Sequence, residues 1–194
     1  MNDAATLTRE AAPRRRDASA TRAAILEAAK AQFARSGYDS TPLRDIAAAA
    51  GADVSLIKRY FGGKEGLFTE ALKTSIHPRF AEWDRASFAR EIAAMMADAP
   101  SAEDGRTHSF QFLLRAATSP TTAPLLNVAV QERFLGPIRD WLGGADAQGR
   151  ARVLAAVFIG FLVERLIRGE PLAGRERDVF IARATATFES LVAA

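Results

Sequence analysis

Hydrophobic side chains recur every three or four residues along most of the chain, the spacing that gathers them on one face of an α-helix. Gly and Pro residues interrupt this pattern at intervals, as they do at helix ends. No segment shows the strict alternation that is typical of a half-buried strand. The pattern therefore predicts an all-α protein of about nine helices, at residues 19–36, 42–50, 55–61, 64 to just before Pro78, 78–97, 106–118, 119–141, 147–168 and 175–192.

Residue types at the helix ends refine these boundaries. Thr41 and Pro42 are predicted to be the N-cap and the first residue of the second helix, because proline needs no N–H there. Pro137 also has no N–H to donate, which predicts a bend in the helix 119–141. Residues 1–18 show no periodicity, so we expect a flexible tail that carries the basic run Arg14–Arg16.

Composition supports helices and argues against catalysis. Forty-one of the 194 residues are alanine, the strongest helix former. The chain has no cysteine, only two histidines, no glycine-rich nucleotide loop and no Ser–His–acid pattern, so we expect no enzyme activity, metal or cofactor. The apolar run 153–163 is about half the ~20 residues of a membrane helix. Together with the lack of a signal peptide, this predicts a cytoplasmic protein with no membrane partner.

The segment 21–68 carries the strongest functional signal, because a helix, a short helix, a glycine-marked turn and a second short helix describe a helix-turn-helix. Its residues TRxxILxAAxxxFAxxGYxxT, LRDIAAAAG and YFGGKEGLF, in this order, closely resemble the TetR/AcrR family of transcriptional regulators. The agreeing positions are Gly37, Tyr38, Thr41, Ile46, Ala47, Gly51, Phe61, Lys64 and Leu67.

The resemblance implies a homodimeric, ligand-responsive regulator, most often a repressor, that binds an inverted-repeat DNA operator and is released by a small hydrophobic effector. It divides the chain into the basic tail 1–18, a helix-turn-helix DNA-binding domain 19–64, and a ligand-binding and dimerisation domain 65–194. It leaves open the effector, the operator sequence, and the choice between repression and activation. Two alternative functions remain: an enzyme, and a helical partner-binding protein that controls no operator.

Side chains on the outer face of the third helix are the candidate DNA contacts, because Ile57 and Phe61, four residues apart, should face inward. Residues at the starts of the second and fourth helices are expected to hold phosphates. The full set is Thr41, Arg44, Ser55, Leu56, Lys58, Arg59, Tyr60 and Lys64. Lys58 stands where the family commonly has a tyrosine. A basic helix can also be a merely solvated face, and Arg14–Arg16 either a solvated tail or a minor-groove arm.

The charge distribution agrees with a DNA-binding N-terminal third. The net charge is only +3, but residues 1–64 hold eleven Lys or Arg against seven Asp or Glu, whereas residues 65–194 hold fifteen against sixteen. All the net positive charge therefore lies where attraction to phosphate would act.

Two surfaces are expected in the remaining chain. A mainly apolar ligand pocket would be lined by Phe80, Trp83, Phe110, Arg115, Gln131, Phe134 and Trp141, although plain core packing also explains these aromatics. The helix 147–168 is apolar nearly all round, so it requires cover on two sides. A dimer interface would use Val157, Gly160, Phe161, Phe180, Ala184 and Phe188, the alternative being a monomeric core.

Overall fold

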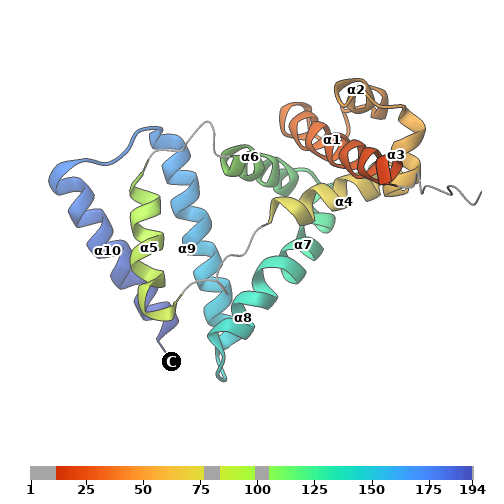
Figure 1. Ribbon diagram of the computed structural model, residues 1–194. Helices are drawn as coiled ribbons and strands as arrows, with labels where there is room; N and C mark the ends of the chain where they lie inside the picture. Colours follow the sequence, from red (N-terminus) through yellow and green to blue (C-terminus); the bar gives the residue numbers. More distant parts are fainter. Residues whose placement is uncertain (1–11, 77–83, 99–104, 194) are drawn as a thin grey trace, which may run out of the picture. The chain divides into compact units, whose positions relative to one another are not determined.

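The computed structural model describes residues 12–76, 84–98 and 105–193, and these residues form helices and their connections (Figure 1). The elements are α1 (Ala12–Ser36), α2 (Leu43–Ala49), α3 (Val54–Phe61), α4 (Lys64–Ser75), α5 (Arg85–Ala97), α6 (Gly105–Thr118), α7 (Ala123–Val130), the π-helical turn η2 (Gln131–Leu135), α8 (Gly136–Leu142), α9 (Ala147–Arg168) and α10 (Gly174–Val192). Since α7, η2 and α8 follow without a break, the described residues contain nine continuous helices. The all-α prediction is confirmed.

The chain divides into two units, a head of residues 1–71 and a body of residues 72–194. The head forms one small core in which the rings of Phe33 and Phe68 meet edge to face, with centroids 5.0 Å apart. Leu67, Phe68 and Ala71 of α4 are buried in this core. For this reason most of α4 belongs to the head, and the boundary falls seven residues later than the expected end of the DNA-binding domain at Lys64.

Helix α1 begins at Ala12, seven residues before the predicted start, so the expected flexible tail was too long. Pro13 lies in the first turn, where its missing N–H costs nothing, and the arginines and alanines that follow favour a helix. The run Arg14–Arg16 therefore lies on helical backbone.

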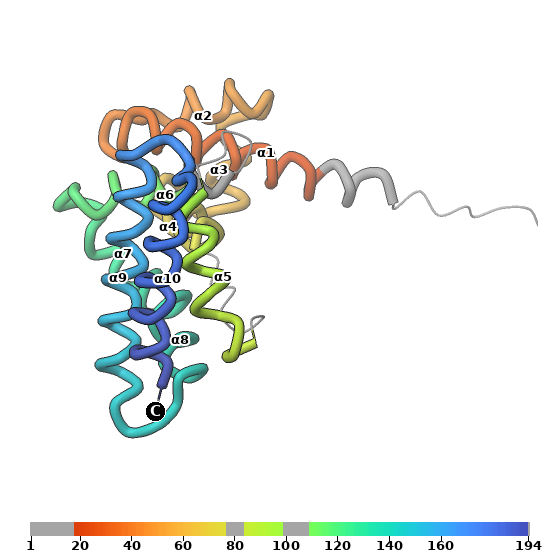
Figure 2. Tube along the Cα trace, turned by 90° about the vertical axis from the view of Figure 1, so that its left-hand side faces the viewer, coloured from red at the N-terminus to blue at the C-terminus, as the bar shows by residue number. Residues whose placement is uncertain are grey.

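The body core is built from α5, α8, α9 and α10, and α10 packs mainly on α5 while also contacting α9 (Figure 2). Its centre holds Phe88 and Ile92 of α5, Leu154 of α9 and Phe188 of α10, all fully buried. The Phe188 ring lies 6.2 Å from that of Phe88 and 5.7 Å from that of Phe161. The prediction that Phe188 and Ala184 form the dimer interface was therefore wrong, because their stripe is buried inside the subunit.

The expected irregularity near Pro137 takes the form of a π-helical turn just before it. In a regular α-helix the proline ring would meet the carbonyl four residues earlier, and one N–H would be missing from the ladder. The turn resolves this conflict, because the Gly136 N–H donates to the Gln131 carbonyl five residues back. A side chain at Gly136 would approach that same carbonyl oxygen to 3.1 Å. Gly136 and Pro137 together thus favour the wider turn.

None of the helices in the described ranges combines the length and apolar character needed to cross a membrane.

Candidate nucleic-acid interface

Helices α2 and α3 are joined by a tight turn that fixes α3 against α2. The turn closes through hydrogen bonds from the Gly51 N–H to the Ala48 carbonyl and from the Ala52 N–H to the Ala47 carbonyl. Gly51 has φ +61°, a backbone conformation that glycine adopts without strain. Ile46 of α2 and Ile57 of α3 are both fully buried in the head. The arrangement is the helix-turn-helix that the sequence predicts.

The outer face of α3 consists of Val54, Ser55, Lys58 and Arg59, which are all exposed. Leu56 and Tyr60 flank this face and are half-buried. The sequence correctly placed three of the four outer residues but missed Val54, whose exposed fraction is 46%. A rotation of 100° per residue puts Val54 one turn before Lys58 on the same ridge, so the helical spacing did contain the signal.

The end of α3 is held by Arg22 of α1, a contact that the sequence pattern does not reveal. The Arg22 guanidinium lies 4.8 Å from the centroid of the Phe61 ring, and its Nη2 donates to Glu70 Oε1 of α4 at 2.8 Å. Arg22 thus connects three helices of the head. Gly66 adds a second restraint, because a Cβ there would lie 1.8 Å from the Phe61 carbonyl oxygen. Only glycine allows α4 to pass so close to the end of α3.

The first turn of α3 carries an acidic cap. Asp53 is the N-cap, and its Oδ1 accepts a hydrogen bond from the Ser55 N–H at 2.7 Å. Hydrogen bonds from the side chain and the backbone of Ser55 lower the pKa of Asp53, so this carboxylate is ionised at neutral pH. A negative charge at this point offsets the positive end of the helix dipole. The first turn of α3 is therefore poorly suited to a phosphate, which argues against the phosphate contact expected of Ser55.

Lys64, at the start of α4, is positioned by an aromatic ring. Its Nζ lies 4.6 Å from the centroid of the Tyr38 ring and donates to the Asp39 carbonyl at 3.4 Å. The Tyr38 ring packs edge to face on Phe68 at 4.9 Å, which anchors it in the head core. Burial, followed by the charges of Glu65 and Asp39, raises the pKa of Tyr38, so its hydroxyl stays protonated and can donate.

The two phosphate contacts expected at the start of α2, Thr41 and Arg44, differ in their exposure to solvent. Thr41 is only 1% exposed, and its hydroxyl donates to the Gly37 carbonyl at 2.6 Å, while Pro42 is the N-cap of α2. The predictions that Thr41 caps α2 and holds a phosphate with its side chain are therefore wrong, because its hydroxyl closes the turn after α1. Arg44 is exposed on α2, with its Nε 3.5 Å from Asp45 Oδ1.

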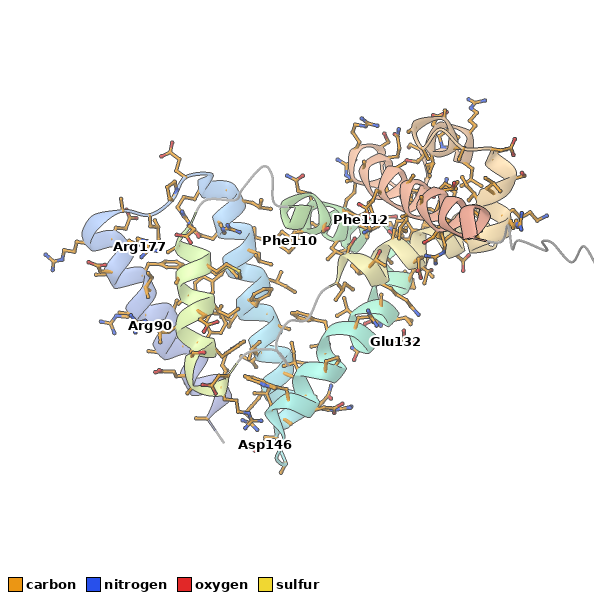
Figure 3. The ribbon with its side chains drawn as sticks, viewed as in Figure 1. Arg90, Phe110, Phe112, Glu132, Asp146 and Arg177 are labelled. Carbon is orange, nitrogen blue, oxygen red and sulfur yellow. The ribbon has the colours of Figure 1, made fainter. Side chains whose placement is uncertain are left out.

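The residues expected to line a ligand pocket come from several parts of the body. Phe80 and Trp83 lie outside the described residues. Trp141 of α8 packs on Phe88 with centroids 4.9 Å apart. The others come from two helical segments: Phe110 (Figure 3) and Arg115 lie on α6, and Gln131 and Phe134 lie on η2.

Side chains of η2 make contacts with α9 and with the end of α4. The Phe134 ring lies 6.0 Å from the Phe158 ring of α9, and Gln131 is half-buried. Glu132 of η2 accepts from Lys73 at 3.1 Å. Across the described ranges, no group of three acidic or histidine side chains is arranged to hold a metal ion.

A second exposed surface runs along α9. Gly149, Val153, Ala156, Gly160 and Ile167 follow one another at helical spacing, and all are exposed. Ile167 is 82% exposed, the largest fraction among the exposed large hydrophobic residues of the described chain. Gly160 leaves open space where a Cβ would stand.

Of the remaining residues expected at a dimer interface, Gly160 lies on this exposed stripe. Val157, Phe161 and Phe180 are half-buried, and the Phe161 and Phe180 rings pack on each other at 5.5 Å.

Comparison with known families covers both units. Residues 25–71 match the family model of the tetR family of bacterial regulatory proteins, and residues 86–192 match that of the tetracyclin repressor-like C-terminal domain. The HTH-type transcriptional repressor SCO4008 of Streptomyces coelicolor is 47% identical over 58 residues, which span 30% of this chain and 30% of that protein.

Solved structures share the fold over most of the chain. A Rhodococcus sp. protein described as a TetR-family transcriptional regulator has a TM-score of 0.65 at 16% identity, covering 90% of this chain and 100% of its own. NalD of Pseudomonas aeruginosa, the secondary repressor of the MexAB-OprM multidrug efflux pump, has a TM-score of 0.63 at 20% identity, covering 88% and 96%.

Proposed function

The chain belongs to the tetR family of bacterial regulatory proteins and is a DNA-binding transcriptional regulator, and from this premise we propose that it acts as a homodimeric repressor. It binds an inverted-repeat operator in the bacterial cytoplasm and is released by a small, mainly apolar effector. The names of SCO4008 and NalD, both repressors, support repression over activation.

The outer face of α3 is the observation that carries the proposal. A helix that reads the major groove needs side chains that reach base edges and cations that meet phosphates. Lys58 and Arg59 are exposed there, with Ser55 beside them. Lys64 would hold a phosphate from the start of α4, where Tyr38 positions its ammonium group. Arg44 would hold a second phosphate from α2.

The exposed stripe of α9 supports dimerisation. Small residues such as Gly160 and Ala156 let a second backbone approach closely, and Val153 and Ile167 supply apolar area that water otherwise covers. A two-fold axis would pair this surface with itself and present two copies of α3. Two such helices enter successive major-groove turns about 34–36 Å apart.

Effector control would act through the body. An effector shifts the equilibrium only if its affinity differs between the DNA-binding and the released state. The aromatic residues of α6 and η2, with Gln131 and Arg115 among them, provide apolar surface and a few polar groups for such a ligand.

Selection from a randomised DNA library by the full chain at moderate salt tests the proposal. We expect enrichment of an inverted repeat, bound by a dimer. Replacing Lys58, Arg59 and Lys64 together by alanine should abolish this binding while size-exclusion chromatography still shows the dimer. A matched control removes three exposed arginines of the body, Arg90, Arg133 and Arg175, and should bind DNA nearly as the unmodified protein does. Selection without any preferred sequence would refute the regulator proposal.

A further inference from the structure

Val54 is an exposed apolar residue on the helix face that would meet DNA. It is a β-branched side chain with 46% of its surface accessible, beside the polar residues Ser55, Lys58 and Arg59. Single exposed apolar residues are common on protein surfaces and need no explanation by themselves. Here the position matters, because in the proposed complex a side chain at this point on α3 would enter the groove along with Lys58, one helical turn further on.

The surroundings of Val54 exclude a role in phosphate binding. Its own side chain has no polar group. The preceding residue is the Asp53 carboxylate, which is held at the start of the helix by the Ser55 N–H at 2.7 Å. That negative charge repels phosphate, and it occupies the N–H that an anion would need. The cations of α3 stand in its last turn, at Lys58 and Arg59. In the proposed complex, the first turn of α3 would therefore face base edges, and the last turn would reach the sugar–phosphate backbone.

An aliphatic side chain recognises one feature of the major groove, the 5-methyl group of thymine, because every other base edge there presents hydrogen-bond donors or acceptors. We propose that Val54 contacts the 5-methyl group of a thymine in each half-site of the operator. This inference rests on the proposed function. It assigns a specificity-determining residue and predicts a thymine at the base pair that the first turn of α3 faces. Val54 would favour thymine over cytosine and uracil, which lack the methyl group.

Substituting deoxyuridine for thymine tests the contact, because it removes the methyl group and nothing else. Each thymine of the selected operator is replaced in turn, in both half-sites, and dissociation constants are measured by fluorescence anisotropy. Burying one methyl group contributes about fourfold in affinity per half-site, and about fifteenfold for the two together. We expect this loss at one symmetric thymine position for the unmodified protein, and no loss at that position for Val54→Ala. Val54→Thr, which keeps one methyl group, should retain part of the sensitivity.

Leu56→Ala serves as the matched variant, since Leu56 is also an apolar residue of the first turn but is half-buried. Circular dichroism confirms that each variant folds. Leu56→Ala should keep the sensitivity. The inference is overturned if no thymine position is sensitive to deoxyuridine, or if the sensitivity survives in Val54→Ala. In either case an operator has been found and the regulator stands. A selection that yields no operator instead refutes the proposed function.

Discussion

Replacing Phe188 by alanine should destabilise the subunit itself rather than the dimer. Phe188 is 0% exposed, and its ring lies against Phe88 of α5 and Phe161 of α9. Truncating a buried phenylalanine to alanine costs about 3–5 kcal/mol in the free energy of unfolding. About 0.5–1.5 kcal/mol of this belongs to each specific ring pair. The loss is large beside a total stability of about 5–15 kcal/mol. If the alanine variant does not fold, Phe188→Leu serves instead, with an expected loss of about 1–2 kcal/mol in the free energy of unfolding.

Urea denaturation at several protein concentrations separates the two possible roles of Phe188. The unfolding of a dimer depends on concentration, so a weaker interface changes that dependence, whereas a weaker subunit core shifts all curves alike. Val179→Ala on the same helix is the control, because Val179 is 52% exposed and its truncation should cost under about 1 kcal/mol of subunit stability. A loss below about 1 kcal/mol for Phe188→Ala, or a loss seen only in dimer dissociation, would refute the assignment of Phe188 to the subunit core.

Four further predictions concern the head. Arg22→Ala should loosen α3, lower the stability of the head by about 1–2 kcal/mol and so weaken operator binding, while the salt dependence of binding stays unchanged. Lys58→Ala should instead lower the slope of log affinity against log salt by about one per lost phosphate contact. Gly66→Ala forces the α4 backbone away from Phe61 and should cost about 1–3 kcal/mol in the free energy of unfolding, measured by thermal melting. Because the pKa of Asp53 is lowered on folding, its stabilisation is present above the ordinary value of 3.8 and is lost as the pH falls through the lowered value. The stability difference between the unmodified protein and Asp53→Asn should therefore vanish in acid, and a pH-independent difference in denaturation midpoints would contradict this role.

Helix boundaries were predictable where glycine and charge mark them. Residues 147–168 were predicted as a helix and α9 has those bounds, because glycines stand on both sides and the apolar run between them is unbroken. The third helix was placed within one residue of α3 for the same reason. The start of α1 was missed, since alanine and arginine favour a helix there without any apolar periodicity.

Pairings between distant residues were not predictable from the pattern. The stripe of Phe180, Ala184 and Phe188 indicates that one face of α10 is buried, but not whether α5 or a second subunit covers it. The contacts of Arg22 with Phe61 and Glu70 join positions up to 48 residues apart, and no local spacing points to them. Thr41 illustrates the opposite error. Its sequence position fits an N-cap of α2, but its hydroxyl donates to the Gly37 carbonyl at the end of α1.

Footprinting the selected operator with dimethyl sulfate tests the central claim, that α3 of each subunit lies in the major groove. The reagent methylates guanine N7 in the major groove and adenine N3 in the minor groove, so it distinguishes the two. We predict two symmetric patches of guanine protection, centred about one helical turn or 10 base pairs apart, which Arg59→Ala and Lys58→Ala weaken equally in both half-sites. A single patch, or protection confined to adenines of the minor groove, would contradict the account.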